Sequence, residues 1–219
     1  MSSVRPPSER PSAPPGDAPP KRNATETKKR LLDAAEAEFA AKGFAGARLR
    51  DVAAAALVQQ ALIHHYFVDK EGLYRAVLER AIAETAEGSW DILGRVSEIR
   101  PLLEAFVDLL LGFYASHANL LAILRMEAAS GSSVAVDLMR DRIKPVFAAV
   151  EALLLRWQRE GAVRADLAAS DLLVAILGLT LFPFQEARLL SALSVGTASS
   201  IEERKHAIVT LVLEGALPR

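Results

Sequence analysis

The chain has 219 residues, of which 51% are hydrophobic and none is cysteine, and its net charge is −1. This composition is sufficient for the packed core of one or two domains, and the lack of cysteine excludes disulfide frameworks, thiolate metal sites and cysteine nucleophiles. The charge is unevenly spread: residues 21–80 carry 11 Lys and Arg against 8 Asp and Glu (+3), residues 1–20 balance at zero, and residues 81–219 therefore carry −4. A local basic excess of this size weakly indicates a phosphate-binding face.

The sequence contains no candidate for membrane insertion. The longest apolar run, residues 172–184, is interrupted by Thr180 and Pro183 and is shorter than the roughly 20 residues that span a bilayer. The N-terminus also lacks the apolar stretch of a secretory signal. We expect a globular cytoplasmic protein without a membrane partner.

Residues 1–22 form the first segment and contain seven prolines among Ser, Ala and Arg, with Val4 as almost the only residue suited to a core. A segment of this composition buries too little apolar surface to offset the entropy of ordering it. We predict a disordered Pro-rich arm.

Helical spacing begins at Asn23. One apolar stripe predicts a first helix with Gly43 as its stop; it comprises Leu31, Leu32, Ala35 and Phe39. A short helix over residues 48–55 and another over 59–66 follow, separated by a three-residue turn at residues 56–58. Two short helices joined in this way are typical of a helix-turn-helix.

Asp69 is a good N-cap for a fourth helix that begins at Lys70 and links the two halves of the chain. Further helices are expected near residues 101–116, 119–130, 134–160, 170–191 and 201–214, with no competing strand pattern. Asn119 and Ser170 are the expected caps, and Gly131 and Gly161 the expected stops. Pro145 either kinks the long helix or marks the start of a second one. The predicted fold class is all-α.

A collinear pattern of nearly fifty residues carries the strongest functional signal. Residues 27–73 read TKKRLLDAAEAEFAAKGFAGARLRDVAAAALVQQALIHHYFVDKEGL, with Lys42-Gly43-Phe44, Arg50-Asp51-Val52-Ala53 and Lys70-Glu71-Gly72-Leu73 at their usual spacing. This stretch resembles the DNA-binding domain of the TetR (tetracycline-repressor-like) family of bacterial regulators. The resemblance implies a helix-turn-helix DNA-binding domain at residues 23–69 and a helical effector-binding and dimerisation domain at residues 70–219.

Three positions depart from the family pattern. Ala47 stands where the family usually has a Thr that caps the second helix and contacts phosphate. Leu57 replaces the turn glycine, which would cost about 1 kcal/mol in a left-handed backbone. Gln59 replaces the Ser that caps the third helix. The hydrophobic frame is unaffected by these changes.

The third helix suits the major groove of B-DNA, because polar side chains at its N-terminal end can reach base edges. Arg48, Tyr66 and Lys70 are expected to hold phosphates, whereas Gln60 and His64 are the better candidates for base edges. The full set of predicted DNA contacts is Arg48, Gln59, Gln60, Ala61, His64, His65, Tyr66 and Lys70. Ile63, Phe67 and part of Leu62 should face inward. The alternative interpretation is that the Gln and His pairs form a solvated helix face.

The second domain is rich in aromatic and methionine side chains, which either line an effector cavity or form plain core. The cavity candidates are Trp90, Phe106, Phe113, Tyr114, Met126, Met139, Phe147 and Trp157. Such a lining predicts a small apolar or amphipathic effector.

By resemblance, the last two helices form the interface of a homodimer that reads a near-palindromic operator in double-stranded DNA. The predicted interface residues are Leu172, Leu173, Ile176, Leu177, Ile208, Leu211 and Val212. A helix that is apolar all round, as at residues 172–184, must be covered on every side.

The other polar residues give no sign of catalysis. Asp137 and Asp141 are one turn apart, but Arg140 and Arg142 flank them, which favours a salt-bridged face over a catalytic pair. His117 and His206 lack metal-ligand spacing and are expected to be structural, and no metal site, cofactor or catalytic residue is predicted. The rival hypotheses are an all-α enzyme and a DNA-binding dimer that needs no ligand, which would have a packed rather than a hollow second domain.

Overall fold

The computed structural model describes residues 21–130, 134–196 and 200–217. Every regular element in these ranges is a helix, which confirms the all-α class. The helices are α1 (Lys21–Gly46), α2 (Leu49–Ala55), α3 (Ala61–Phe67), α4 (Lys70–Arg95), α5 (Ile99–Ser116), α6 (Ala118–Ser130), α7 (Val134–Arg142), α8 (Lys144–Arg159), α9 (Ala169–Gln185), α10 (Ala187–Ala192) and α11 (Ile201–Ala216).

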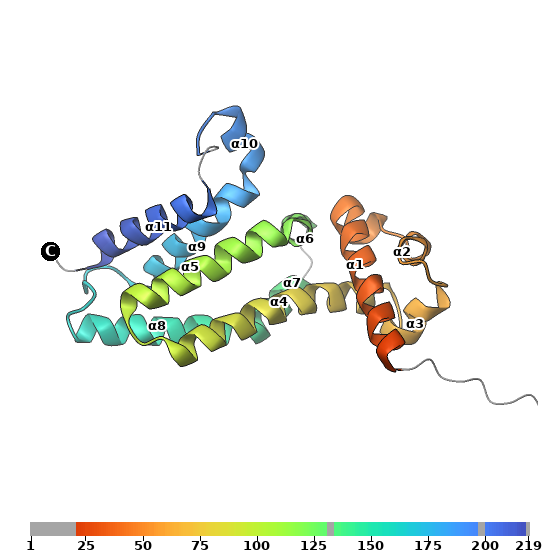
Figure 1. The fold of residues 1–219 in the computed structure, drawn as a ribbon, viewed down its shortest axis with the longest axis horizontal. Helices are drawn as coiled ribbons and strands as arrows, with labels where there is room; N and C mark the ends of the chain where they lie inside the picture. Colours follow the sequence, from red (N-terminus) through yellow and green to blue (C-terminus); the bar gives the residue numbers. More distant parts are fainter. Residues whose placement is uncertain (1–20, 131–133, 197–199, 218–219) are drawn as a thin grey trace, which may run out of the picture.

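The molecule is elongated, with a small head at one end and a larger helical body at the other (Figure 1). Helices α1, α2 and α3 form the head, and α4 runs from the head along the body. The body is built by α4, α5, α8, α9 and α11, while α10 projects from it (Figure 1). The N-terminal half of α4 and helix α6 pack against the head, so both elements connect the two parts.

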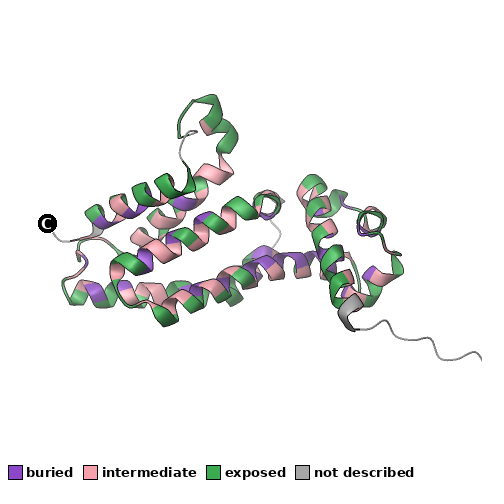
Figure 2. Cartoon of the chain, viewed as in Figure 1, coloured by how far each residue is buried: buried purple, intermediate pink, exposed green. Residues whose placement is uncertain are grey.

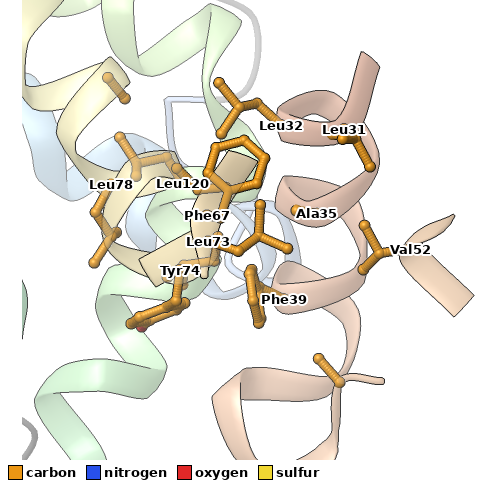
Figure 3. Packing of buried hydrophobic residues seen from close by; sticks show 14 of the residues in the cluster. Leu31, Leu32, Ala35, Phe39, Val52, Phe67, Leu73, Tyr74, Leu78 and Leu120 are labelled. Carbon is orange, nitrogen blue, oxygen red and sulfur yellow. The ribbon is translucent and has the colours of Figure 1, made fainter. Parts of the chain in front are cut away.

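The head has a core of side chains that are almost completely buried (Figure 2 and Figure 3). The predicted stripe of α1 faces this core and meets residues from α2, α3, α4 and α6. The core members with less than 2% exposure are Leu31, Ala35, Phe39, Val52, Ile63, Leu73, Val77, Leu78, Leu120 and Ile123. Burying side chains of this size stabilises the fold by about 1.5–3 kcal/mol each, and it fixes the position of the two short helices.

A buried polar link joins the head core to the body. The hydroxyl of Tyr74 on α4 donates to the carboxylate of Glu127 on α6, and the second carboxylate oxygen accepts the backbone N–H of Ala135 on α7 at 3.1 Å. Tyr74 and Glu127 are both at most 5% exposed. Burial, followed by the neighbouring carboxylate, raises the pKa of Tyr74, so the phenol remains a donor.

Several helix ends differ from the sequence prediction. Helix α1 begins at Lys21, two residues before the expected start. Its helical backbone breaks at the predicted stop, Gly43, where φ is 67° and ψ is 174°, and a short helical segment then continues to Gly46. Asn119 is not a cap, because α6 begins one residue earlier, at Ala118. Ser170 lies inside α9, whose N-cap is Ala168. By contrast, Asp69 caps α4 as predicted, accepting the Gly72 N–H at 2.7 Å.

Two long predicted helices are each divided. Residues 134–160 form α7 and α8, and Pro145 lies in the first turn of α8 rather than at a kink, where its missing N–H costs nothing. Residues 170–191 form α9 and α10, with Glu186 between them. The apolar spacing continues across both breaks, so periodicity alone did not reveal them.

Two predictions lie wholly or largely outside the described residues: the Pro-rich arm at residues 1–22, of which the structure covers residues 21 and 22 in α1, and the stop at Gly131. Gly161 follows the end of α8 with φ 74°, as expected for a helix stop. In the described ranges, no single helix combines the length and apolar character of a membrane span; α5 and the first part of α6 do so only together, bent by 87°.

Candidate DNA-binding interface and effector cavity

Within the described part of the chain, helix α2 has no side-chain cap of its own, and residues of α1 hold its N-terminal end instead. Arg48 occupies the N-cap position of α2 with an extended backbone. In the described structure its side chain makes no capping hydrogen bond to the first turn of α2. Glu38 of α1 instead accepts the Arg48 backbone N–H at 3.3 Å, the reciprocal half of a capping box. Lys42 joins Glu38 at 2.7 Å and Asp51 at 3.2 Å. Sequence reasoning missed Glu38, since the partner comes from another helix.

The turn between α2 and α3 has a left-handed residue at position 57, as the resemblance to the TetR pattern implied. Leu57 has φ 56° and is 83% exposed. The turn is closed by the Val58 N–H, which donates to the Ala53 carbonyl at 3.0 Å. Leucine therefore occupies a left-handed position that favours glycine, at a cost of about 1 kcal/mol.

Helix α3 is anchored on one side and open on the other. Ile63 and Phe67 are 0% and 6% exposed and Leu62 is half-buried, as predicted. The residues predicted to approach bases are exposed, namely Gln59, Gln60, Ala61, His64 and His65. Gln60, rather than Gln59, is the N-cap residue of α3. A fixed helix with an open polar row is the geometry that major-groove reading needs.

The ring of His64 is held by its own helix end. Its Nδ1 lies 2.8 Å from the carbonyl oxygen of Val68. Because a carbonyl oxygen only accepts, Nδ1 carries the proton, and Nε2 of the neutral ring is an acceptor. A neutral His64 can therefore accept from the amino groups of adenine or cytosine in the major groove.

Two of the predicted phosphate contacts also pack against the head. Tyr66 is half-buried and its ring lies 5.0 Å from that of His65. Lys70 donates to the Ala45 carbonyl at 3.3 Å, and its ammonium lies 4.8 Å from the ring centroid of Phe44. The ammonium keeps two further donors at the N-terminus of α4, where the helix dipole also favours an anion. Arg48 is exposed at the start of α2.

A tight corner joins α3 to α4, and the sequence analysis did not anticipate it. Val68 has φ 67° and ψ −59°, and the Asp69 N–H donates to the Phe67 carbonyl at 2.7 Å. This is a strained γ-turn, rare for a β-branched residue. The corner brings the Phe67 carbonyl so close to α4 that a Cβ on Gly72 would lie 2.1 Å from it. The closeness explains why Gly72 follows Lys70-Glu71.

The body contains a cavity of about 560 Å³ among α4, α5, α6, α7, α8 and α9. Five of the eight predicted lining residues border it: Phe106, Phe113, Tyr114, Met139 and Phe147. Trp157 borders a smaller adjoining cavity of about 80 Å³. The larger volume lies within the range of about 300–1,000 Å³ that is usual for small-molecule sites.

Two predicted lining residues lie elsewhere. Trp90 is 47% exposed on α4 and borders neither of these two cavities. Met126 faces α1, where its Sδ is 3.5 Å from the position of a Cβ on Gly43. Both were chosen by residue type, and type alone does not give the direction of a side chain on its helix.

Polar residues that the sequence prediction did not include also line the cavity: Thr85, Ser89, Arg140, Lys144 and Gln185. Burial raises the pKa of Tyr114 to about 12, so its phenol is protonated at neutral pH. Its hydroxyl makes no hydrogen bond to any part of the chain that the structure describes. Tyr114 is therefore a donor available to a ligand.

The comparisons with known proteins agree with both parts of this geometry. Residues 31–77 match the family of bacterial regulatory proteins described as the tetR family, and residues 100–212 match the tetracyclin repressor-like C-terminal domain. The chain belongs to the TetR family. The family consists of DNA-binding transcriptional regulators, and the matched segments coincide with the head and the hollow body.

Individual TetR-family members extend this result. The HTH-type transcriptional repressor SCO4008 of Streptomyces coelicolor is 30% identical over 158 residues, which are 72% of this chain and 78% of that protein. The structure of the ketosteroid regulator KstR2 of Mycobacterium tuberculosis matches 88% of this chain and 95% of its own, with 20% identity and a TM-score of 0.70. The structure of FadR from Bacillus subtilis in complex with stearoyl-CoA matches 85% and 98%, with 14% identity and a TM-score of 0.68.

The predicted TetR-type dimer residues mostly face the interior of the body. Four residues of α9 are half-buried and line the cavities: Leu172, Leu173, Ile176 and Leu177. Ile208 is 4% exposed and Val212 is half-buried, so only Leu211, at 60%, is open. The outward apolar residues of α9 are instead Val174, Leu179 and Phe182. A helix that is apolar all round has no periodicity to show which side faces inward.

Several of the remaining polar candidates have structural partners. Asp137 pairs with Arg140 at 2.9 Å, and Arg142 pairs with Glu79 at 2.9 Å, which fits a salt-bridged face. The Nδ1 of His117 lies 2.9 Å from the Phe113 carbonyl oxygen. Among the residues that the structure describes, no group of three or more His, Asp and Glu side chains is placed to hold a metal ion.

Proposed function

We propose that this TetR-family protein is a cytoplasmic transcriptional repressor that binds a near-palindromic operator as a homodimer and is released by a small apolar or amphipathic ligand. The observation that carries the proposal is the exposed polar row of α3 on a helix anchored by Ile63 and Phe67. The hollow body supports the ligand-dependent version over a DNA-binding dimer that needs no ligand.

Two roles are proposed on the head. Arg48, Tyr66 and Lys70 hold phosphates and position the head, whereas Gln60 and His64 read bases. Loss of a phosphate contact weakens binding to all DNA sequences alike, whereas loss of a base contact weakens binding to the preferred sequence only. The two roles can therefore be separated experimentally.

The decisive experiment measures binding to a selected operator and to scrambled DNA over several salt concentrations. Lys70→Ala should weaken binding to both DNAs and reduce the salt slope by about two per dimer. Gln60→Ala should lose about 1–3 kcal/mol on the operator only. Arg188→Ala, an exposed cation of α10, serves as the control and should match the parent. Equal losses on both DNAs for Gln60→Ala would contradict its role in base reading.

Dimer formation is proposed from the outer apolar face of α9 and α11. Val174, Phe182 and Leu211 are between 49% and 66% exposed, and a helix that is apolar all round requires cover. Phe182→Glu should place a charge in the interface and yield monomers by light scattering. Leu155→Glu, at an apolar position of α8 that is 48% exposed, should leave the assembly unchanged. A parent protein that is monomeric at micromolar concentration would overturn this part.

Release is proposed to pass through α4 and α6, which contribute to both the head core and the cavity wall. Leu73 and Leu78 of α4 pack in the head, and Ile82, one turn further on, borders the cavity. Leu120 of α6 belongs to both. A ligand that shifts either helix moves the head, and the coupling should be about 1–3 kcal/mol and reciprocal. A ligand whose affinity is indifferent to operator DNA would favour an enzyme or carrier instead.

A further inference from the structure

The two cavities of the body share part of one wall. Phe106, Leu110, Phe147 and Leu177 border both the cavity of about 560 Å³, here called the outer chamber, and the cavity of about 80 Å³, here called the inner chamber. The two spaces are therefore adjacent on either side of these side chains. One ligand can extend from the outer chamber toward the inner one.

The two chambers differ in chemistry. Every residue that lines the inner chamber is apolar, including Leu102, Val150 and Trp157. The chamber is also smaller than the cavity of about 150 Å³ that accepts benzene in another protein. It therefore suits the end of a slender hydrocarbon chain and excludes a polar group, whose burial without a partner is costly.

The outer chamber has an excess of positive charge. Arg140 and Lys144 border it, and among its described lining residues there is no carboxylate. Arg140 is paired with Asp137 at 2.9 Å, but Lys144 has no hydrogen-bond or ion-pair partner in the described ranges. Both cations are exposed, so an anion bound to them keeps part of its hydration. The charge pattern fits a ligand with one anionic end.

Three hydroxyl-bearing residues also line the outer chamber: Thr85, Ser89 and Tyr114. Tyr114 offers a free donor, whereas Ser89 and Thr85 donate to the backbone carbonyls of Thr85 and Ala81 at 2.8 Å and 3.1 Å. The last two hydroxyls can therefore only accept further bonds. A carboxylate, which accepts but cannot donate, is matched by Tyr114 and Lys144 together.

We propose that the effector is an amphipathic anion: a carboxylate held near Lys144 and Tyr114, attached to an unbranched hydrocarbon chain that passes Phe106 and Phe147 and ends beside Trp157. The inference deepens the proposed function and rests on it for the consequence of binding, although not for the binding itself. Chain length should set affinity, because each buried methylene strengthens binding about three- to fourfold.

The experiment uses Trp157 as an internal reporter. The only other tryptophan, Trp90, is half exposed on the outer side of α4, so Trp90→Phe leaves Trp157 at the inner chamber as the single tryptophan. The full-length protein is titrated with hexanoate, decanoate and hexadecanoate, and with hexadecanol and hexadecyltrimethylammonium as neutral and cationic controls. Affinity should rise with carboxylate length, and Trp157 emission should change only with the longer chains.

Two variants test the two ends separately. Lys144→Ala should weaken binding of hexadecanoate about three- to tenfold and leave the affinity for hexadecanol unchanged, since only the anion contacts the Lys144 ammonium. Val150→Phe should fill the inner chamber and abolish the advantage of hexadecanoate over decanoate. Arg159→Ala, an exposed cation of α8 outside both chambers, is the matched control and should have no effect. Operator binding without ligand confirms that each variant is folded.

The outcomes are distinguishable. Equal affinity for hexadecanol and hexadecanoate, or no Trp157 response to any chain, would overturn the proposed ligand class. The same holds if no alkanoate binds, whatever the operator assay gives. If hexadecanoate binds as expected and operator affinity does not change, the ligand class is supported and the release mechanism under the proposed function fails instead.

Discussion

The head and the body of this protein use apolar side chains in opposite ways. In the head, Leu31, Ile63 and Leu73 are 0% exposed and pack against one another. In the body, Phe113, Tyr114 and Phe147 border a space of about 560 Å³. A filled core holds a reading helix in one orientation, because close-packed interiors resist small displacements. A hollow core can change shape when a ligand fills it, so the two parts suit reading and sensing respectively.

The largest expected effect comes from a substitution at the closely packed corner between α3 and α4. Gly72→Ala places a Cβ 2.1 Å from the Phe67 carbonyl, and this backbone atom cannot move without opening the corner between α3 and α4. We expect a loss of about 3 kcal/mol or more in the free energy of unfolding, together with loss of operator binding. Thermal unfolding and DNA titration measure both quantities.

Gly94→Ala is the matched control in the same helix. A Cβ on Gly94 would meet nothing within 4 Å, so the change should stabilise α4 by up to about 1 kcal/mol through helix propensity. If the two alanine variants are equally stable, the corner described for Phe67 and Gly72 does not exist in solution.

The next effect compares added volume in the two cores. Leu78→Phe adds a ring to the filled head and should cost about 1–3 kcal/mol. Leu121 is nearly as buried, at 8% against 0% for Leu78, but it borders the outer chamber. Leu121→Phe should therefore cost under about 1 kcal/mol and reduce the space for ligand. Urea unfolding of both variants checks the difference, and equal losses would mean that the body is packed rather than hollow.

A smaller effect concerns the left-handed turn before α3. Leu57→Gly removes the strain at φ 56° and should stabilise the head by up to about 1 kcal/mol, which raises the melting temperature by about 2–4 °C. Ala54→Gly, at an exposed position inside α2, should instead cost about 1 kcal/mol. Calorimetry of the two glycine variants distinguishes strain relief from a general effect of glycine, which would destabilise both.

The smallest effect is an ionic one on the head surface. The hydrogen bond from Lys42, followed by that from Arg50, lowers the pKa of Asp51 below its ordinary 3.8. Because the folded pKa is the lower one, the stabilisation is present above pH 3.8 and is lost as the pH falls through the folded value. Asp51→Asn should slightly lower stability at neutral pH, less so in high salt. A variant whose deficit grows in acid would contradict the assignment.

The head was predictable from the sequence in most respects. The stripe of α1, the cap at Asp69 and the inward side of α3 depend on local spacing, and each is observed. The role of Glu38 at the start of α2 was missed because the two residues meet only when α1 and α2 are packed. The strained corner at Val68 was missed because no local pattern requires valine to adopt a positive φ.

For the body, the sequence indicated which residue types are present but not the direction in which their side chains point. Aromatic and methionine content left open whether these side chains line a cavity or form plain core, and it gave no direction for them: Trp90 faces outward and Met126 faces α1. The polar lining residues, such as Lys144, have ordinary surface chemistry in the sequence, and only the folded chain shows that they border a cavity.

The sequence by itself determined the helical class, the family and the position of the helix-turn-helix, because these follow from apolar spacing, turn residues and a collinear motif that local chemistry expresses. Only the tertiary structure decided which side of α9 faces the cavity, where the two chambers meet at Phe106 and Phe147, and how α4 connects head and body. A helix with apolar residues on all sides satisfies the local rules in every rotation about its axis. Its orientation is chosen by the volumes of the helices packed around it, which are distant in the chain.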